Sequence, residues 1–179
     1  KVSPTQTQFS ENGYTTWFES EKTAMGLFGS WMLSEFKAND YVAQNCDVAV
    51  LPQGKQRATI YNGLGNAIAA SSQHKEEAWK FVEYLGSEEA NKIQAESGVA
   101  IPAYEGTTDA WMKTQTKFNS KVYADMLAYA KINPYSKETD KWQTAEKESL
   151  LNAFTGKVSV NDACDEVAKK VNAVLATEK

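Results

Sequence analysis

Apolar residues recur with the period of an α-helix along much of the chain. The clearest series has i, i+3, i+4, i+7 spacing, at Ala78, Phe81, Val82 and Leu85. It predicts a helix that begins near Ser72 and ends at Gly86, followed by one from Ser87 to Gly98. Further helices are predicted near 15–21, 108–117, 120–131, 139–155 and 160–176. The last of these places apolar residues on one face, at Ala163, Val167, Val171, Val174 and Leu175.

Short β-branched and apolar runs predict extended segments in the first half of the chain. Residues 23–28 and 47–51 are predicted as buried strands, and 57–61 and 66–70 as extended runs around a flexible loop. Ser30 is placed to cap a short helix that runs through Phe36. Residues 99–103 form an extended connector before and around Pro102. The pattern therefore predicts an α/β protein whose second half is mostly helical.

Composition narrows the classes of partner. The chain has 179 residues, is 42% hydrophobic and carries a net charge of −4, with one arginine, Arg57. It offers no basic face for nucleic acid, and the shortage of arginine disfavours a phosphate ligand. No apolar run approaches the ~20 residues that a membrane helix needs. The chain opens at Lys1, and we expect it to be a piece of a longer protein.

Reactive residues are few. The single histidine, His74, lies in a polar stretch before a helix, where a solvated side chain is expected. Cys46 and Cys164 have no CxxC partner, so both free thiols and a disulfide remain open. No glycine-rich phosphate loop, metal-ligand cluster or catalytic set is visible, and no cofactor is expected. Trp79 and Trp111 fall within predicted helices, where we expect them to be packed.

Six landmarks stand along the chain in a characteristic order. They are Phe18-x3-Lys22-Thr23-Ala24-Met25 leading to Gly29-Ser30-Trp31; Asp47-Val48-Ala49-Val50-Leu51-Pro52-x-Gly54; Gly63-x-Gly65-Asn66-Ala67-Ile68; Ala78-x2-Phe81-Val82-x2-Leu85-x-Ser87-x-Glu89; Gly98-x2-Ile101-Pro102-Ala103; and Leu151-x2-Phe154-x-Gly156-x2-Ser159-Val160-x2-Ala163. In this order the chain resembles the extracellular solute-binding proteins of sugar-type ABC importers, the maltose-binding-protein-like family. The landmarks match only the C-terminal part of a family member.

The resemblance implies a periplasmic-binding-protein-like (type II) α/β fold of two lobes, of which this helix-rich chain would hold the C-terminal part only. Residues 1–47 and 104–179 would belong to the C-terminal lobe and residues 53–97 to the N-terminal lobe. Hinge crossings would lie at 48–52 and 98–103. Strands in 53–97 would have unpaired edges, so we expect a dimeric or swapped arrangement.

The resemblance also implies a function. The protein would be a non-catalytic binding component that captures a sugar or oligosaccharide and delivers it to an ABC permease. It would act outside the cytoplasmic membrane, in the periplasm or as a cell-surface lipoprotein whose signal segment is absent from this chain. Polyamine, iron or glycerol-phosphate ligands remain open within the class.

Sugar recognition suggests which residues would hold the ligand. An indole face suits the C–H face of a pyranose, and the hydroxyl rim needs fixed donors and acceptors. Family position implies that Trp31 stacks on sugar, and Trp142 matches another aromatic that faces the cleft. The remaining candidates offer backbone groups or small polar side chains, namely Gly29, Ser30, Tyr61, Asn62 and Gly63. No acidic residue is nominated as a hydroxyl acceptor.

Two functions of other classes remain open. A glycan-active enzyme domain could also use exposed aromatic residues in a groove, but it would need a pair of carboxylates about 5–10 Å apart. A helical interaction domain is supported only by the helix-rich second half. Sugar binding without turnover would separate the binding protein from both.

Overall fold

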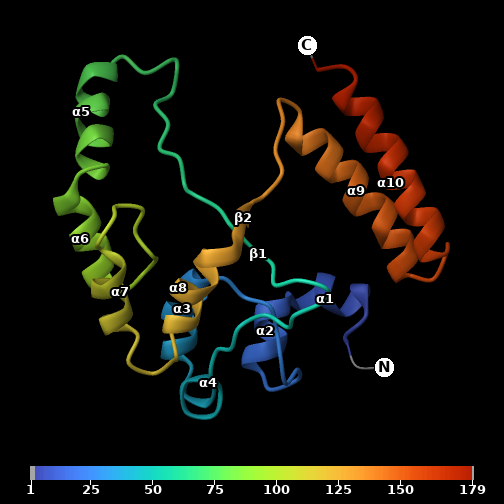
Figure 1. Ribbon diagram of the computed structural model, residues 1–179, viewed down its shortest axis with the longest axis horizontal. Helices are drawn as coiled ribbons and strands as arrows, with labels where there is room; N and C mark the ends of the chain where they lie inside the picture. The colour runs from blue at the N-terminus through green and yellow to red at the C-terminus, as the bar shows by residue number, and fades with distance from the viewer. Residues whose placement is uncertain (1–2, 179) are drawn as a thin grey trace. The chain divides into compact units, whose positions relative to one another are not determined.

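A computed structural model of the chain describes residues 3–178 and is helix-rich (Figure 1). It divides into two compact units. Unit 1 combines the residues up to Tyr14 with those from Asn133 onward, and unit 2 is Thr15–Ile132.

Unit 2 contains most of the secondary structure. In chain order its elements are α2 (Tyr14–Glu19, which begins at the unit boundary), η1 (Ser30–Met32), α3 (Leu33–Ala38), α4 (Asp40–Asn45), β1 (Thr59–Tyr61), α5 (Lys75–Leu85), α6 (Glu88–Ser97), α7 (Thr108–Thr114), α8 (Lys121–Met126), η2 (Leu127–Tyr129) and β2 (Ala130–Ile132). The two strands pair in parallel, with Ile60 opposite Lys131.

The hydrophobic core of unit 2 draws on both halves of its sequence. Its buried members are Leu33, Phe36, Val42, Ala95, Trp111 and Phe118. Beside them the rings of Phe18, Phe28 and Phe36 pack together with centroids 4.8–5.3 Å apart. Such tilted aromatic contacts add to the free energy gained from burial alone. This core fixes the segment from Gly29 to Ala38 on the unit.

The helices around Gly98 form as predicted. The Ser87 hydroxyl accepts a hydrogen bond from the Ala90 amide and begins α6, and Gly98 ends it with a φ of 75°. The Gly98 carbonyl accepts hydrogen bonds from Ser34 Oγ (3.0 Å) and Gln115 Nε2 (2.8 Å). These bonds join α6 to α3 and to the end of α7.

Unit 1 is built on a pair of long helices. Its elements are α1 (Gln6–Asn12), α9 (Thr139–Phe154) and α10 (Val160–Leu175), and α9 and α10 lie side by side (Figure 1). Ser159 begins α10 by accepting a hydrogen bond from the Asp162 amide, as the sequence predicts. Ala163 is buried between the helices, and Lys170 reaches Ser149 Oγ at 3.2 Å.

Two predicted strands are wrong. Within residues 3–178 the β1–β2 pair is the one sheet, so 23–28 and 47–51 are irregular. The extended run predicted at 66–70 also pairs with no strand. An extended run becomes a strand only where a neighbouring backbone takes up its hydrogen bonds. At 47–51 the Asp47 carboxylate instead accepts from the Val48 amide (2.8 Å) and from the Asn119 amide (2.7 Å).

Three helix boundaries also differ from the prediction. The helix predicted over 120–131 ends at Met126, and the chain continues through η2 into β2, where it pairs with β1. Ser30 is the first residue of η1 and not its cap, because the cap position falls on Gly29. Ser72 accepts a hydrogen bond from the His74 amide, and α5 begins after His74.

The two tryptophans expected to be packed differ. Trp111 is fully buried, while Trp79 on α5 is 58% exposed. Phe81, from the same apolar series that predicts α5, is 61% exposed. Periodicity thus predicts the helix correctly but the burial of Phe81 wrongly, and the packing expected for Trp79 from its place in a helix is also wrong.

Candidate functional site

The indole of Trp142 is held in place at the start of α9. Its Nε1 donates a hydrogen bond to Ser136 Oγ at 2.9 Å, and Ser136 Oγ donates to Glu178 Oε1 at 2.6 Å. Glu178 also accepts from the amides of Glu138 (2.9 Å) and Lys137 (3.3 Å). These hydrogen bonds, led by that from Ser136, lower the pKa of the Glu178 carboxyl from its ordinary value.

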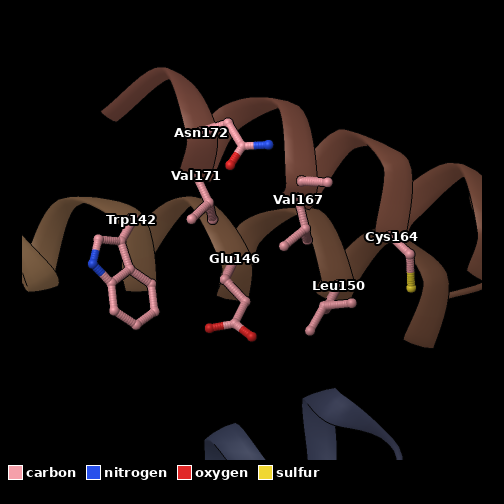
Figure 2. Close-up of a pocket in the computed structure, with 8 residues that line it drawn as sticks. Trp142, Glu146, Leu150, Cys164, Val167, Val171 and Asn172 are labelled. Atoms are coloured by element: carbon pink, nitrogen blue, oxygen red, sulfur yellow. The ribbon is translucent and has the colours of Figure 1, made fainter. Parts of the chain in front are cut away.

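An open groove of about 410 Å³ runs along α9 and α10, with Trp142 in its wall (Figure 2). Residues of α9 at i, i+4, i+8 spacing line it: Trp142, Glu146 and Leu150. The residues from α10 are Cys164, Val167, Ala168, Val171 and Asn172. The lining is mainly apolar, with the Glu146 carboxylate and the Asn172 amide as its polar groups.

This arrangement suits a ligand with an apolar face and a polar rim. An aromatic surface beside apolar side chains can contact C–H groups, a carboxylate accepts hydrogen bonds from hydroxyls, and an amide both donates and accepts. Glu146 and Asn172 were not predicted as site residues. The signal for Glu146 is present in the sequence, because a residue four positions after Trp142 lies on the same helix face.

Trp31 lies at the surface of unit 2. It is the middle residue of η1 and 61% of its surface is exposed. Its ring lies directly over Gly29, because a Cβ added to Gly29 would come within 2.2 Å of the ring atoms. Ser30, between them, is half-buried. The predicted cluster of Gly29, Ser30 and Trp31 therefore offers an aromatic surface backed by bare backbone.

Tyr61, Asn62 and Gly63 form a separate exposed group in unit 2. Tyr61 is the last residue of β1, and Asn62 and Gly63 follow it in an irregular loop. A Cβ added to Gly63 would meet nothing within 4 Å, so backbone groups there are open to a ligand. The candidate residues are thus brought together in three places, two in unit 2 and one, at Trp142, in unit 1.

Both cysteines are free thiols, with Cys46 half-buried and Cys164 exposed on the groove. The part of the chain that the structure describes contains no group of three or more histidine, cysteine or acidic residues able to hold a metal ion. Among the same residues, no helix combines the length and the apolar character required to span a bilayer.

Comparison with known proteins assigns the chain to a family. Residues 1–92 match the model of the bacterial extracellular solute-binding proteins. The chain belongs to this family. The resemblance inferred from the six landmarks is therefore confirmed.

Individual relatives agree with the family match. The chain is 27% identical over 164 residues to proteins described as maltooligosaccharide ABC transporter solute-binding lipoproteins, from two strains of Streptococcus pneumoniae. The match covers 88% of this chain and 38% of each relative, so the chain spans well under half the length of these relatives.

Proposed function

We propose that the protein is the sugar-binding component of an ABC importer and that its ligand is an oligosaccharide of the maltose series. The observation that carries the proposal is the fixed Trp142 indole in a groove that also contains Glu146 and Asn172, in a chain that belongs to the solute-binding family. The named activity of the pneumococcal relatives supports the choice of ligand class.

In this proposal the aromatic residues supply the stacking surfaces. Trp142 and Trp31 would each contact the apolar face of a pyranose ring. Glu146 and Asn172 would hydrogen-bond hydroxyl groups beside Trp142. Within unit 2, backbone groups around Gly29 and Gly63 and the Asn62 side chain would supply polar contacts to sugar hydroxyls.

The protein would release its ligand to a membrane permease outside the cytoplasm and would perform no chemistry on it. The two proposed hinge segments, 48–52 and 98–103, are free of helix and strand, which supports their role as crossings between lobes. A bound sugar would favour the closed arrangement of the lobes only through contacts that the open arrangement lacks.

Calorimetric titration of the intact protein with maltotriose tests the proposal, with cellotriose as the matched sugar of different linkage. We expect binding of maltotriose and about a tenfold loss of affinity in Trp142→Ala and in Trp31→Ala. Trp79→Ala is the control, because Trp79 is a similarly exposed tryptophan outside both places. If Trp142→Ala and Trp31→Ala bind maltotriose with the same affinity as wild type and Trp79→Ala, the proposed site is wrong. Release of shorter sugars during incubation would contradict the non-catalytic role.

A further inference from the structure

Hydrogen bonds through Ser136 link the Glu178 carboxylate to the Trp142 indole, which lines the groove. Glu178 follows α10, whereas Trp142 lies in the first turn of α9. Ser136 connects them, since its single hydroxyl donates to Glu178 (2.6 Å) while accepting from Trp142 Nε1 (2.9 Å). The short first bond is typical of a hydroxyl that donates to a charged oxygen.

We infer that Glu178 is a positioning residue for Trp142: it orients the Ser136 hydroxyl, and that hydroxyl fixes the rotation of the indole in the groove wall. The inference rests on the proposed function, since it assigns Glu178 a role in sugar binding without contact to the sugar. A serine hydroxyl has one proton, so donation to Glu178 turns its lone pairs toward the indole N–H.

The start of α9 depends on the same carboxylate. Glu138, at the cap position, makes no side-chain capping bond, and Glu178 accepts from the amides of Lys137 and Glu138. A negative charge there is also favoured by the helix dipole.

The Ser136 backbone is fixed independently, because its amide donates to Thr139 Oγ1 (2.7 Å) and its carbonyl accepts from the same hydroxyl (2.8 Å). Loss of Glu178 therefore frees the Ser136 hydroxyl while its backbone remains held.

Several charged groups among the described residues lie near the link. Lys137 favours the ionised form of Glu178, Glu138 pairs with Lys141 at 2.7 Å, and Glu146 lies one helical turn after Trp142. Protonation of Glu178 would weaken its hold on Ser136. We therefore expect the Trp142 indole N–H to sense the titration of Glu178, with a midpoint below that of an ordinary glutamate.

The test follows the indole N–H resonance of Trp142 by NMR in the intact protein, assigned with Trp142→Phe. Glu178→Ala and Ser136→Ala are expected to shift this resonance at neutral pH and to abolish its acidic titration. Glu178→Gln, which keeps the oxygen acceptor, is expected to restore the position without the titration. Glu166→Gln is the control, because Glu166 is an α10 carboxylate paired with Lys170 and is not part of the link. A Trp142 resonance that is the same in Glu178→Ala and wild type would overturn the inference.

Sugar affinity provides the second readout. Maltotriose affinity is expected to fall about fivefold to tenfold in Glu178→Ala, as for one lost hydrogen bond, and not to fall further when Trp142→Ala is already present. Full additivity of the two substitutions would overturn the inference even if sugar binds. If no sugar binds, the proposed function fails, while the NMR titration still decides the link between Glu178 and Trp142.

Discussion

The ring of Trp31 occupies the space that a side chain on Gly29 would need. An added Cβ would lie 2.2 Å from two ring atoms of Trp31, well inside van der Waals contact. The backbone at Gly29 is extended, with φ −80° and ψ 161°, so alanine would be tolerated there by the backbone itself. The glycine is therefore needed for the ring and not for the turn.

Gly29→Ala is expected to displace the Trp31 indole with less than about 1 kcal/mol lost in unfolding free energy, because the exposed ring can move away. Maltotriose affinity should fall about as far as in Trp31→Ala. Gly54→Ala is the control, since a Cβ there meets nothing within 4 Å. Urea unfolding and calorimetric titration make the two measurements. Unchanged affinity in Gly29→Ala would contradict the role of Trp31.

The helices of this chain are predictable because their signals are local. Ser87 and Gly98 bound α6, and Ser159 begins α10, each through a bond within four residues. Strand formation depends on a partner far along the chain. β1 pairs with residues 130–132, which continue a helical pattern in the sequence, so the pair could not be predicted from either segment alone.

The candidate site also combines residues with a local sequence signal and residues that only tertiary structure brings together. Trp31 and Trp142 are candidates from their places in the family pattern alone, while Glu146 and Asn172 become candidates only when α9 and α10 are laid side by side. The link from Trp142 through Ser136 to Glu178 spans 42 residues between its hydroxyl and carboxylate. No local pattern indicates it, because a glutamate that follows a helix is ordinarily a solvated side chain.

Gly98→Ala is expected to be one of the most destabilising glycine substitutions. Gly98 has φ 75°, and an added Cβ would meet Thr114 Oγ1 at 2.7 Å and Gln115 Nε2 at 3.1 Å. Gly156→Ala is a matched control, because its φ is 74° and nothing lies within 4 Å. The backbone penalty of about 1–2 kcal/mol applies to both, and crowding adds about 1–3 kcal/mol at Gly98. Urea unfolding should show this difference; equal losses would contradict it.

Asn91→Ala is expected to reduce the unfolding free energy by about 2–3 kcal/mol. The buried Asn91 amide donates to the carbonyls of Leu85 (3.1 Å) and Ser87 (2.9 Å) and accepts from the Tyr104 amide (3.3 Å). Removing it deprives the Leu85 carbonyl and the Tyr104 amide of this partner, while the Ser87 carbonyl keeps its bond from the backbone amide of residue 91 (3.1 Å). Asn45→Ala removes one exposed bond to Tyr41 and should cost less than about 0.5 kcal/mol. A similar loss in both variants would contradict the role of Asn91.

Substitutions on the apolar surface of the chain test the expected dimeric or swapped arrangement. Helices α5 and α6 carry several large exposed side chains, at Trp79, Phe81, Tyr84 and Ile93. We expect the chain alone to self-associate in light scattering and Phe81→Glu to shift it toward monomer. Phe154→Glu is the matched control, because Phe154 is 84% exposed and lies outside residues 53–97. A monomeric wild-type chain with protected amides in 58–70 would refute the expectation.

Glu19→Gln is expected to stabilise the protein slightly at neutral pH. Burial raises the pKa of the Glu19 carboxyl above its ordinary value, and repulsion from Glu35 adds to the rise. A raised pKa in the folded state means that the folded protein holds this proton more tightly than the unfolded chain. The stabilising contribution of the protonated Glu19 carboxyl to the unfolding free energy is therefore fully present below the pKa of Glu19 in the unfolded chain. It is lost as the pH rises through the pKa of Glu19 in the folded protein. At pH 7 the unfolding free energy of Glu19→Gln should exceed that of wild type by less than about 1 kcal/mol. Under acid conditions, where Glu19 is neutral in both the folded and unfolded states, the two unfolding free energies should converge. A gain that is the same at every pH would show that the substitution acts through packing and not through the charge.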